Sequence, residues 1–172
     1  KAEDFQPTHI YTSPLLRAAE TAKIVGLLWP IPIEPWDDLT EQNGGVFDGL
    51  TWDEVATQYP KLYPASGELI DWESVDGAES NSLVSSRAAR LINTVISGHA
   101  NNDTVLIFAH GGIIQHMVAS LLGTDRFWGI GVSNTAIFEF SIDQTRWFGR
   151  GVERQNNLIW WIGRFNDASH LG

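Results

Sequence analysis

The feature that most constrains this chain is a short apolar run that ends in a histidine and two glycines. Residues 104–109 read T-V-L-I-F-A, and His110-Gly111-Gly112 precede a second apolar stretch over residues 113–122. A run of this length between turn residues is typical of a parallel strand that is buried on both faces. Because parallel strands need crossover connections, usually helices, this segment predicts an α/β fold.

The remaining patterns fit an alternation of strands and helices. We expect further strands over residues 9–12, 31–35, 136–142 and 157–163. The second of these contains two prolines, which limit it to a sheet edge. We expect helices over residues 13–28, 51–58, 80–97 and 113–122, the second of them capped by Thr51. The helix over 80–97 is predicted from an apolar stripe at three- and four-residue spacing, formed by Leu83, Val84, Ala88, Leu91, Ile92 and Val95. Ser13 is predicted to be the N-cap of the first helix, with Pro14 in its first turn.

These elements predict a single domain over residues 1–172, a three-layer α/β sandwich around a mostly parallel central sheet. A chain of 172 residues is long enough for one sizeable core. Residues 44–80 combine a glycine-rich loop at 44–49 with an irregular stretch at 60–76. We expect them to form a cap or insertion.

Composition excludes several classes of partner. The formal net charge is −10 with only 11 Lys and Arg, so the chain should repel nucleic acid and anionic membranes. No apolar run approaches the ~20 residues of a membrane helix, and residues 1–7 lack the apolar part of a signal peptide. The absence of cysteine fits a cytoplasmic location. An anionic ligand would therefore require the few cations to gather in one pocket.

Two predicted strand-to-helix junctions, at residues 12–17 and 108–112, carry side chains suited to chemistry. Ligands of parallel sheets bind beyond the carboxyl ends of the strands, where free N–H groups at helix starts suit an anion. Arg17, in the first turn of its helix, could grip a phosphate with two hydrogen bonds. His110 stands at the tip of an apolar strand, and Gly111 allows a ligand to approach the backbone closely.

Arg17 and His110 also have purely structural explanations. Arg17 could form a surface contact with Glu20 or Thr21, and His110 could cap its helix. We favour an anion site because both side chains are predicted at equivalent junctions of one sheet.

Glu41 is a third candidate, as the proton donor to the leaving group of a phosphoester. It lies just before the loop at residues 44–49. A carboxylic acid can deliver such a proton when its pKa is raised. Spacing alone leaves its acidic neighbours open as rivals, namely Asp37, Asp38 and Asp48.

The other histidines give weaker signals. We expect His116 to pack within its helix and His99 to be solvated, and we assign no role to His9 or His170. These residues do not form a convincing set of metal ligands. No lysine-containing phosphate loop and no G-x-G-x-x-G occurs, so neither a metal nor another cofactor is predicted.

Three aromatic residues are candidates for the wall of a substrate pocket. They are Phe47, Trp52 and Trp72, all within the expected cap. For each of them, burial in a core or on the surface is the more ordinary alternative.

The ordered motifs of the chain resemble those of the histidine phosphatase (phosphoglycerate mutase-like) superfamily. Residues 11–22 (Y-T-S-P-L-L-R-A-A-E-T-A) are similar to its S-P-L-x-R-x-x-x-T-A segment, and residues 39–49 to its L-x-E…G-x-[WF]-[ED]-G stretch. Residues 76–80 (D-G-A-E-S), 105–114 (V-L-I-F-A-H-G-G-I-I) and 133–136 (S-N-T-A) resemble its later motifs in family order. Each motif is weak alone, but the set runs through nearly the whole chain.

The resemblance implies a reaction and a role for each residue. Arg17 and Gly111 would bind the phosphoryl group, Glu41 would protonate the leaving alcohol, and His110 would donate to the phosphoryl oxygens as the second histidine of the pocket. The reaction would be phosphomonoester hydrolysis through a phosphohistidine, of the histidine acid phosphatase type. The substrate would be a small phosphorylated molecule, no cofactor is implied, and a homodimer stays open.

One family motif is absent. The family opens with a strand that ends in R-H-G, whose histidine takes the phosphoryl group, and no R-H-G occurs in these 172 residues. The chain could be a fragment, a degenerate non-catalytic relative, or one that receives the strand from another chain. We favour a fragment because Arg17, Glu41 and His110 are all retained and because a missing central strand would orphan buried backbone groups. We expect the 172-residue chain alone to be inactive.

Two alternative functions remain at this stage. The nearest is the phosphoryl transfer of a phosphoglycerate mutase, an isomerase. Mutases of the family carry a longer insertion between the glutamate and the second histidine, so the short segment 42–109 favours a phosphatase. The other alternative is a non-catalytic domain that binds phosphate or a partner.

Overall fold

A parallel sheet of three strands forms the centre of the molecule. The computed structural model describes residues 5–63, 70–148 and 159–172. The strands are β1 (His9–Thr12), β2 (Ile33–Pro35) and β3 (Val105–Phe108), in the order β2-β1-β3. Central β1 pairs with both neighbours, so Ile10 lies opposite Ile33 and Leu106. The proline-containing strand β2 is at an edge, as its composition predicts.

A second sheet consists of two antiparallel strands. These are β4 (Ile137–Ile142) and β5 (Trp160–Asp167). The last predicted strand, residues 157–163, therefore lies a few residues further along the chain, and its positions 157 and 158 are outside the described residues. The mostly parallel sheet that we expected divides into a parallel and an antiparallel part.

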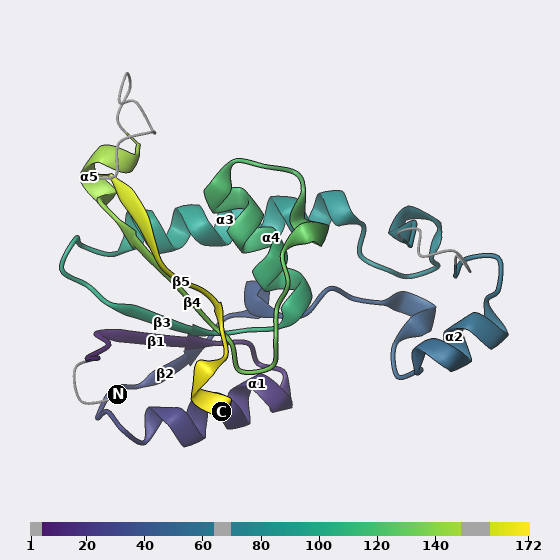
Figure 1. Ribbon diagram of the computed structural model, residues 1–172, viewed down its shortest axis with the longest axis horizontal. Helices are drawn as coiled ribbons and strands as arrows, with labels where there is room; N and C mark the ends of the chain where they lie inside the picture. Colours follow the sequence, from purple (N-terminus) through teal and green to yellow (C-terminus); the bar gives the residue numbers. More distant parts are fainter. Residues whose placement is uncertain (1–4, 64–69, 149–158) are drawn as a thin grey trace.

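Helices cover both faces of the parallel sheet. The helices of the described residues are α1 (Leu16–Gly26), α2 (Trp52–Gln58), α3 (Asn81–Gly98), α4 (Gly111–Leu122) and α5 (Gln144–Trp147), and of these α1, α3 and α4 flank the parallel sheet. Short 3₁₀ segments lie at Asp37–Leu39, Gly45–Phe47, Trp72–Ser74, Phe127–Gly129 and Ser169–Leu171. Figure 1 shows α1 on one side of the sheet and α3 and α4 on the other, which confirms the predicted α/β fold. Among the described residues, no helix has the length and apolarity to cross a bilayer.

The main core lies between the sheet and the pair α3–α4. The predicted apolar stripe of α3 supplies Val84, Ala88, Leu91 and Ile92, which pack with Ile113 and Met117 of α4 and with Tyr11 of β1. Leu83, expected on this stripe, is instead 60% exposed, because the stripe continues through Ile96 on the opposite flank of the helix. The start of α3 is as expected, since the Ser80 hydroxyl accepts a hydrogen bond from Leu83 N at 3.2 Å.

Strand β3 departs from the expectation drawn from its sequence. Its four side chains are only half-buried, whereas an apolar run of this kind predicts burial on both faces. The reason is its place in the sheet: β3 pairs with β1 on one side, and no other described residue pairs with it on the other. Solvent therefore reaches side chains that a further strand and its helix would cover.

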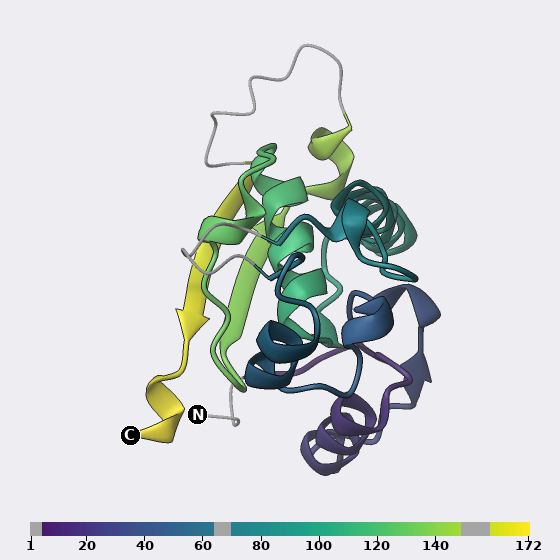
Figure 2. The same ribbon diagram turned by 90° about the vertical axis from the view of Figure 1, so that its right-hand side faces the viewer.

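The segment expected to form a cap has a small core of its own. Phe47, Val55 and Val75 are buried together. A bridge between Gly44 and Ala78 closes the base of this segment. Figure 1 shows α2 away from the sheet, and Figure 2, seen from that side, shows this segment in front of the rest of the molecule. Helix α2 begins with a capping box between Thr51 and Glu54. Residues 64–69 are outside the described part, and the exact limits 44–80 of a cap stay a prediction.

Candidate active site

The carboxyl ends of β1 and β3 lie side by side, and the chain leaves them toward opposite faces of the sheet. Just beyond both strands, Ser13 N donates a hydrogen bond to Phe108 O at 2.9 Å. Helix α1 follows β1 on one face, and α4 follows β3 on the other (Figure 1). Adjacent parallel strands whose helices diverge in this way leave a crevice where open α/β sheets bind ligands.

His110 is buried at this crevice, with 7% of its surface exposed. It occupies the N-cap position of α4, but its side chain does not cap the helix. Instead its Nε2 forms a hydrogen bond with Ser13 Oγ at 2.8 Å. Burial lowers the pKa of the imidazole, the Arg17 charge lowers it further, and the Glu41 carboxylate partly opposes both effects. A neutral imidazole is therefore favoured.

Arg17 is the second residue of α1, and its side chain is exposed. Its effect on the pKa of His110 places its charge near the crevice. Among the described residues, no carboxylate forms an ion pair with it. Thr21 does contact Arg17, but its hydroxyl donates to the backbone carbonyl at 2.8 Å and leaves the guanidinium free of that contact. The surface contacts that offered a structural explanation for Arg17 are therefore not made by its charged group.

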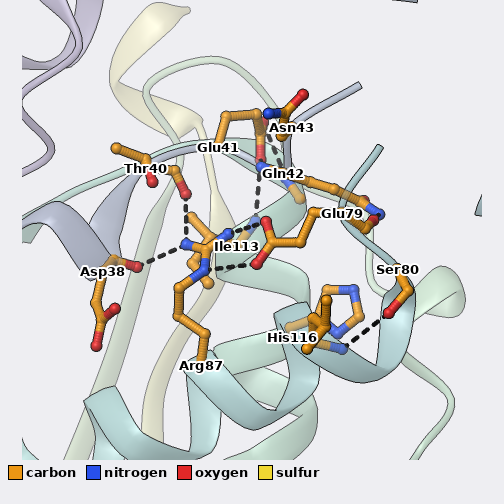
Figure 3. A network of polar contacts seen from close by, with 12 residues as sticks. Asp38, Thr40, Glu41, Gln42, Asn43, Glu79, Ser80, Arg87, Ile113 and His116 are labelled. Atoms are coloured by element: carbon orange, nitrogen blue, oxygen red, sulfur yellow. Dashed lines mark hydrogen bonds and ion pairs between the residues drawn. The ribbon is translucent and has the colours of Figure 1, made fainter. Parts of the chain in front are cut away.

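Glu41 reaches the start of α4 from the loop after the 3₁₀ turn Asp37–Leu39. Its carboxylate accepts hydrogen bonds from Gly112 N at 3.2 Å, Ile113 N at 3.1 Å and Gln42 N at 3.0 Å (Figure 3). Free N–H groups at this helix start were expected to hold an anion. Two of them hold the Glu41 carboxylate instead, directly beside His110.

The acidic rivals of Glu41 have other partners. The Asp38 carboxylate pairs with Arg90 at 3.2 Å, and Asp48 Oδ1 accepts a hydrogen bond from Gly44 N at 3.0 Å. Asp37 contributes its backbone carbonyl to Thr40 at 2.8 Å. None of these contacts leads to His110.

The two glycines after His110 are not equivalent. A Cβ on Gly112 would lie 2.6 Å from Glu41 Oε1, whereas a Cβ on Gly111 would meet no atom within 4 Å. Gly112 therefore makes room for the Glu41 carboxylate. Gly111 leaves open space, which suits its predicted contact with a ligand.

Ser13 is a site residue that the sequence analysis missed. We expected it to cap α1, but that helix begins at Leu16 with Leu15 as its N-cap, and no side chain caps it. Residues 13–15 stay outside the helix, and the fully buried Ser13 hydroxyl bonds to His110 and accepts a longer hydrogen bond from Leu15 N at 3.2 Å. The available signal was the position of Ser13 directly before Pro14 at the end of a strand, because a residue before proline is disfavoured in the helical conformation.

The three aromatic candidates lie in the segment 44–80. Phe47 is 5% exposed, and its ring centroid lies 6.0 Å from that of Trp72, so Phe47 belongs to the core of that segment. Trp52, on α2, is 55% exposed and stacks on Tyr63. A pocket wall built from Trp52 or Trp72 stays a prediction.

Two further histidines are engaged in packing. His116 is buried, as expected; it bonds to Ser85 Oγ at 2.9 Å and stacks on Phe127. His99 is not solvated as we expected: its Nδ1 contacts Val95 O at 2.8 Å and its Nε2 contacts Tyr11 OH at 3.1 Å, because β1 brings Tyr11 beneath the end of α3. Within the described ranges, no three His, Cys, Asp or Glu residues could share a metal ion.

Comparison with known proteins identifies the family. The family model described as the histidine phosphatase superfamily (branch 1) matches residues 1–154. The chain is 26% identical to phosphoserine phosphatase 1 of Hydrogenobacter thermophilus over 163 residues, which cover 94% of this chain and 75% of that protein. It is 32% identical to glucosyl-3-phosphoglycerate phosphatase of Mycolicibacterium vanbaalenii over 124 residues, 69% of this chain and 55% of the relative.

A solved structure has the same fold. YhfR of Bacillus stearothermophilus superimposes with a TM-score of 0.80 at 25% identity, over 99% of this chain and 79% of that one. The chain thus spans part of the length of each of these relatives. The family match, the phosphatase relatives and the common fold agree, and the chain belongs to the histidine phosphatase superfamily.

Proposed function

We propose that this chain builds most of the site of a phosphomonoesterase and that a histidine outside the 172 residues takes the phosphoryl group. The observation that carries the proposal is the arrangement at the ends of β1 and β3. There His110 is buried against Ser13 with Arg17 and Glu41 close enough to change its pKa. The phosphatase names of the relatives support hydrolysis of a phosphate ester as the reaction.

In the proposed reaction, a histidine nitrogen attacks phosphorus while the ester P–O bond breaks. The exposed guanidinium of Arg17 binds phosphoryl oxygens, and neutral His110 donates a hydrogen bond to them without repelling Arg17. Glu41 gives its proton to the leaving alcohol oxygen. Water then attacks the phosphohistidine and loses its proton to the Glu41 carboxylate, and inorganic phosphate leaves.

The open edge of β3 supports a position for the nucleophile. A strand paired there would end beside β1 and β3, at the crevice that holds His110. It would also pair β3 backbone groups that no described residue pairs. The open space next to Gly111 supports a small phosphate monoester as the substrate. The homodimer that the sequence leaves open stays a prediction.

The test compares two forms of the protein. The first is the 172-residue chain, and the second is the same chain with all residues that its gene encodes upstream. Both are incubated with an aryl phosphate and with a phosphate-labelled substrate at mildly acid pH. We expect turnover and an acid-labile labelled protein only from the second form, with loss of both in its His110→Ala variant.

Three outcomes would decide against the proposal. Normal turnover by the 172-residue chain would show that no outside histidine is needed. Transfer of label to a second hydroxyl group of the substrate, in place of release to water, would identify a mutase. Phosphate binding by the second form without turnover of any ester would identify a binding domain.

A further inference from the structure

Arg87 is a buried charge that the proposed reaction does not use. It lies on α3 and is 8% exposed. Its Nε donates to Glu79 Oε1 at 2.9 Å and its Nη2 to Glu79 Oε2 at 2.5 Å, so the two side chains form a two-point ion pair. A buried pair of this kind is weak evidence for a role in stability, because apolar side chains of similar volume often serve as well.

The same guanidinium holds the backbone that carries Glu41. Arg87 Nη1 donates to the carbonyl oxygens of Asp38 and Thr40, both at 2.7 Å (Figure 3). These carbonyls immediately precede Glu41. The planar, fixed array of Arg N–H groups can bind two carbonyls and a carboxylate together, which a lysine cannot.

Glu79 holds the backbone and side chain on the other side of Glu41. Its N–H donates to Asn43 O at 2.9 Å, and its carbonyl accepts a hydrogen bond from Gln42 Nε2 at 2.8 Å. The residues before and after Glu41 are therefore both tied to one ion pair on α3. From this fixed segment the Glu41 side chain extends to the amides of Gly112 and Ile113 (Figure 3).

We infer that Arg87 and Glu79 are positioning residues, which fix the segment 38–43 so that the Glu41 carboxylate lies at the start of α4 beside His110. The consequence for catalysis rests on the proposed role of Glu41 as proton donor. The placement of Glu41 does not depend on that role, because hydrogen exchange of the Gly112 and Ile113 amides measures it directly. The two parts can therefore be tested apart.

Hydrogen exchange on the form extended upstream tests the placement. The Arg87→Lys variant keeps the charge, and the double variant Arg87→Met with Glu79→Leu removes the pair without leaving a buried charge. In both we expect the amides of Gly112 and Ile113 to exchange about tenfold faster, the equivalent of one lost hydrogen bond, relative to Val118 in the same helix. Arg90→Met is the matched control: Arg90 is on the same helix and binds Asp38, but through an exposed pair.

Kinetics of the form extended upstream test the consequence. The double variant should lower kcat for an alkyl phosphate by about 10- to 100-fold with little change in KM, as expected for a displaced catalytic group. The loss in kcat/KM, which covers phosphoryl transfer to the histidine but not hydrolysis of the phosphohistidine, should be much smaller for p-nitrophenyl phosphate, whose phenolate leaves without a proton. A general structural defect would lower both rates alike.

Unchanged exchange at Gly112 and Ile113 in both variants would overturn the inference, as would equal acceleration in Arg90→Met. Faster exchange in the double variant, with losses in kcat/KM that are equal for the alkyl and aryl substrates both in that variant and in Glu41→Gln, would support the placement and overturn the proton-donor role of Glu41. Failure of the proposed function is thus distinguishable from failure of the positioning role.

Discussion

The two strand-to-helix junctions at the candidate site look equivalent in sequence and differ in structure. After β3, helix α4 begins at once, and two amides of its first turn are bound by Glu41. After β1, three residues outside any helix or strand precede α1, the Ser13 hydroxyl bonds to His110, and the Arg17 side chain is exposed. The junction after β3 thus contains the Glu41 carboxylate. The junction after β1 contains the Arg17 guanidinium, which forms no ion pair among the described residues.

The difference indicates which part of the proposed reaction each junction serves. A phosphoryl group would be attracted to the junction after β1, where the Arg17 guanidinium forms no ion pair with a described residue. The junction after β3 places an acid next to that position. Four experiments test whether the two junctions have these separate roles, and they are given in order of decreasing effect.

Replacing Glu41 tests the junction after β3. In the form extended upstream, Glu41→Gln keeps an oxygen that can accept from the helix amides but removes the acid. We expect kcat for an alkyl phosphate to fall by about 10²- to 10⁴-fold. Asp48→Asn, in the same loop region, is the control and should change kcat little. A larger loss in the control would reassign the proton donor.

Replacing Arg17 tests the junction after β1. We expect Arg17→Met to weaken binding of inorganic phosphate by about 10- to 100-fold, the usual range for a charged hydrogen bond, with Arg17→Lys between the two. Titration calorimetry on the extended form measures this. Lys23→Met removes the same charge from the last turn of α1 and should have a small effect. Equal weakening by both variants would reduce the role of Arg17 to net charge.

The two glycines of α4 provide a finer comparison. A Cβ at Gly112 would displace the Glu41 carboxylate, because the side chain can move more easily than the helix. We expect Gly112→Ala to make the Ile113 amide exchange about tenfold faster, as for one lost hydrogen bond. Gly111→Ala, with open space at that position, should leave this amide protected. The idea fails if both variants behave alike.

The smallest effect concerns pH. Burial lowers the pKa of both His110 and His116 below the ordinary value of 6.5. The unfolded chain therefore takes up protons first as the pH falls, so stability is full above 6.5 and declines below it. We expect urea unfolding to show a loss of at most about 1.4 kcal/mol per pH unit for each histidine between about pH 6.5 and 5. His110→Gln should reduce the slope, and an unchanged slope would contradict the assignment.

Local patterns predicted the elements well. The apolar run at β3, the Thr51 cap and most of the α3 stripe all depend on residues a few positions apart, whose physics is contained in the segment itself. The α/β order followed from them. The half-buried state of β3 could not be predicted in the same way, because it depends on which strands lie beside it.

The contacts of the site were harder to foresee. Ser13 and His110 are 97 residues apart, and either could have bonded to its own helix. Glu41 was proposed as a proton donor, and the α4 amides were proposed separately as an anion site. Nothing in the sequence shows that the Glu41 carboxylate binds these amides. Arg87 did leave a signal, because it stands three residues after Val84 and four before Leu91, on the buried stripe of α3. A charge at such a position calls for a partner.

The bridge between Gly44 and Ala78 has a consequence for how this protein could diversify. The two chain segments that enter and leave the projecting lobe are joined there, and Glu79 ties them to α3 right behind the bridge. Insertions, deletions or replacement of residues beyond this bridge would change the projecting segment and leave the position of Glu41 unchanged. Substrate selectivity and catalytic reactivity could then change independently during the evolution of such a fold.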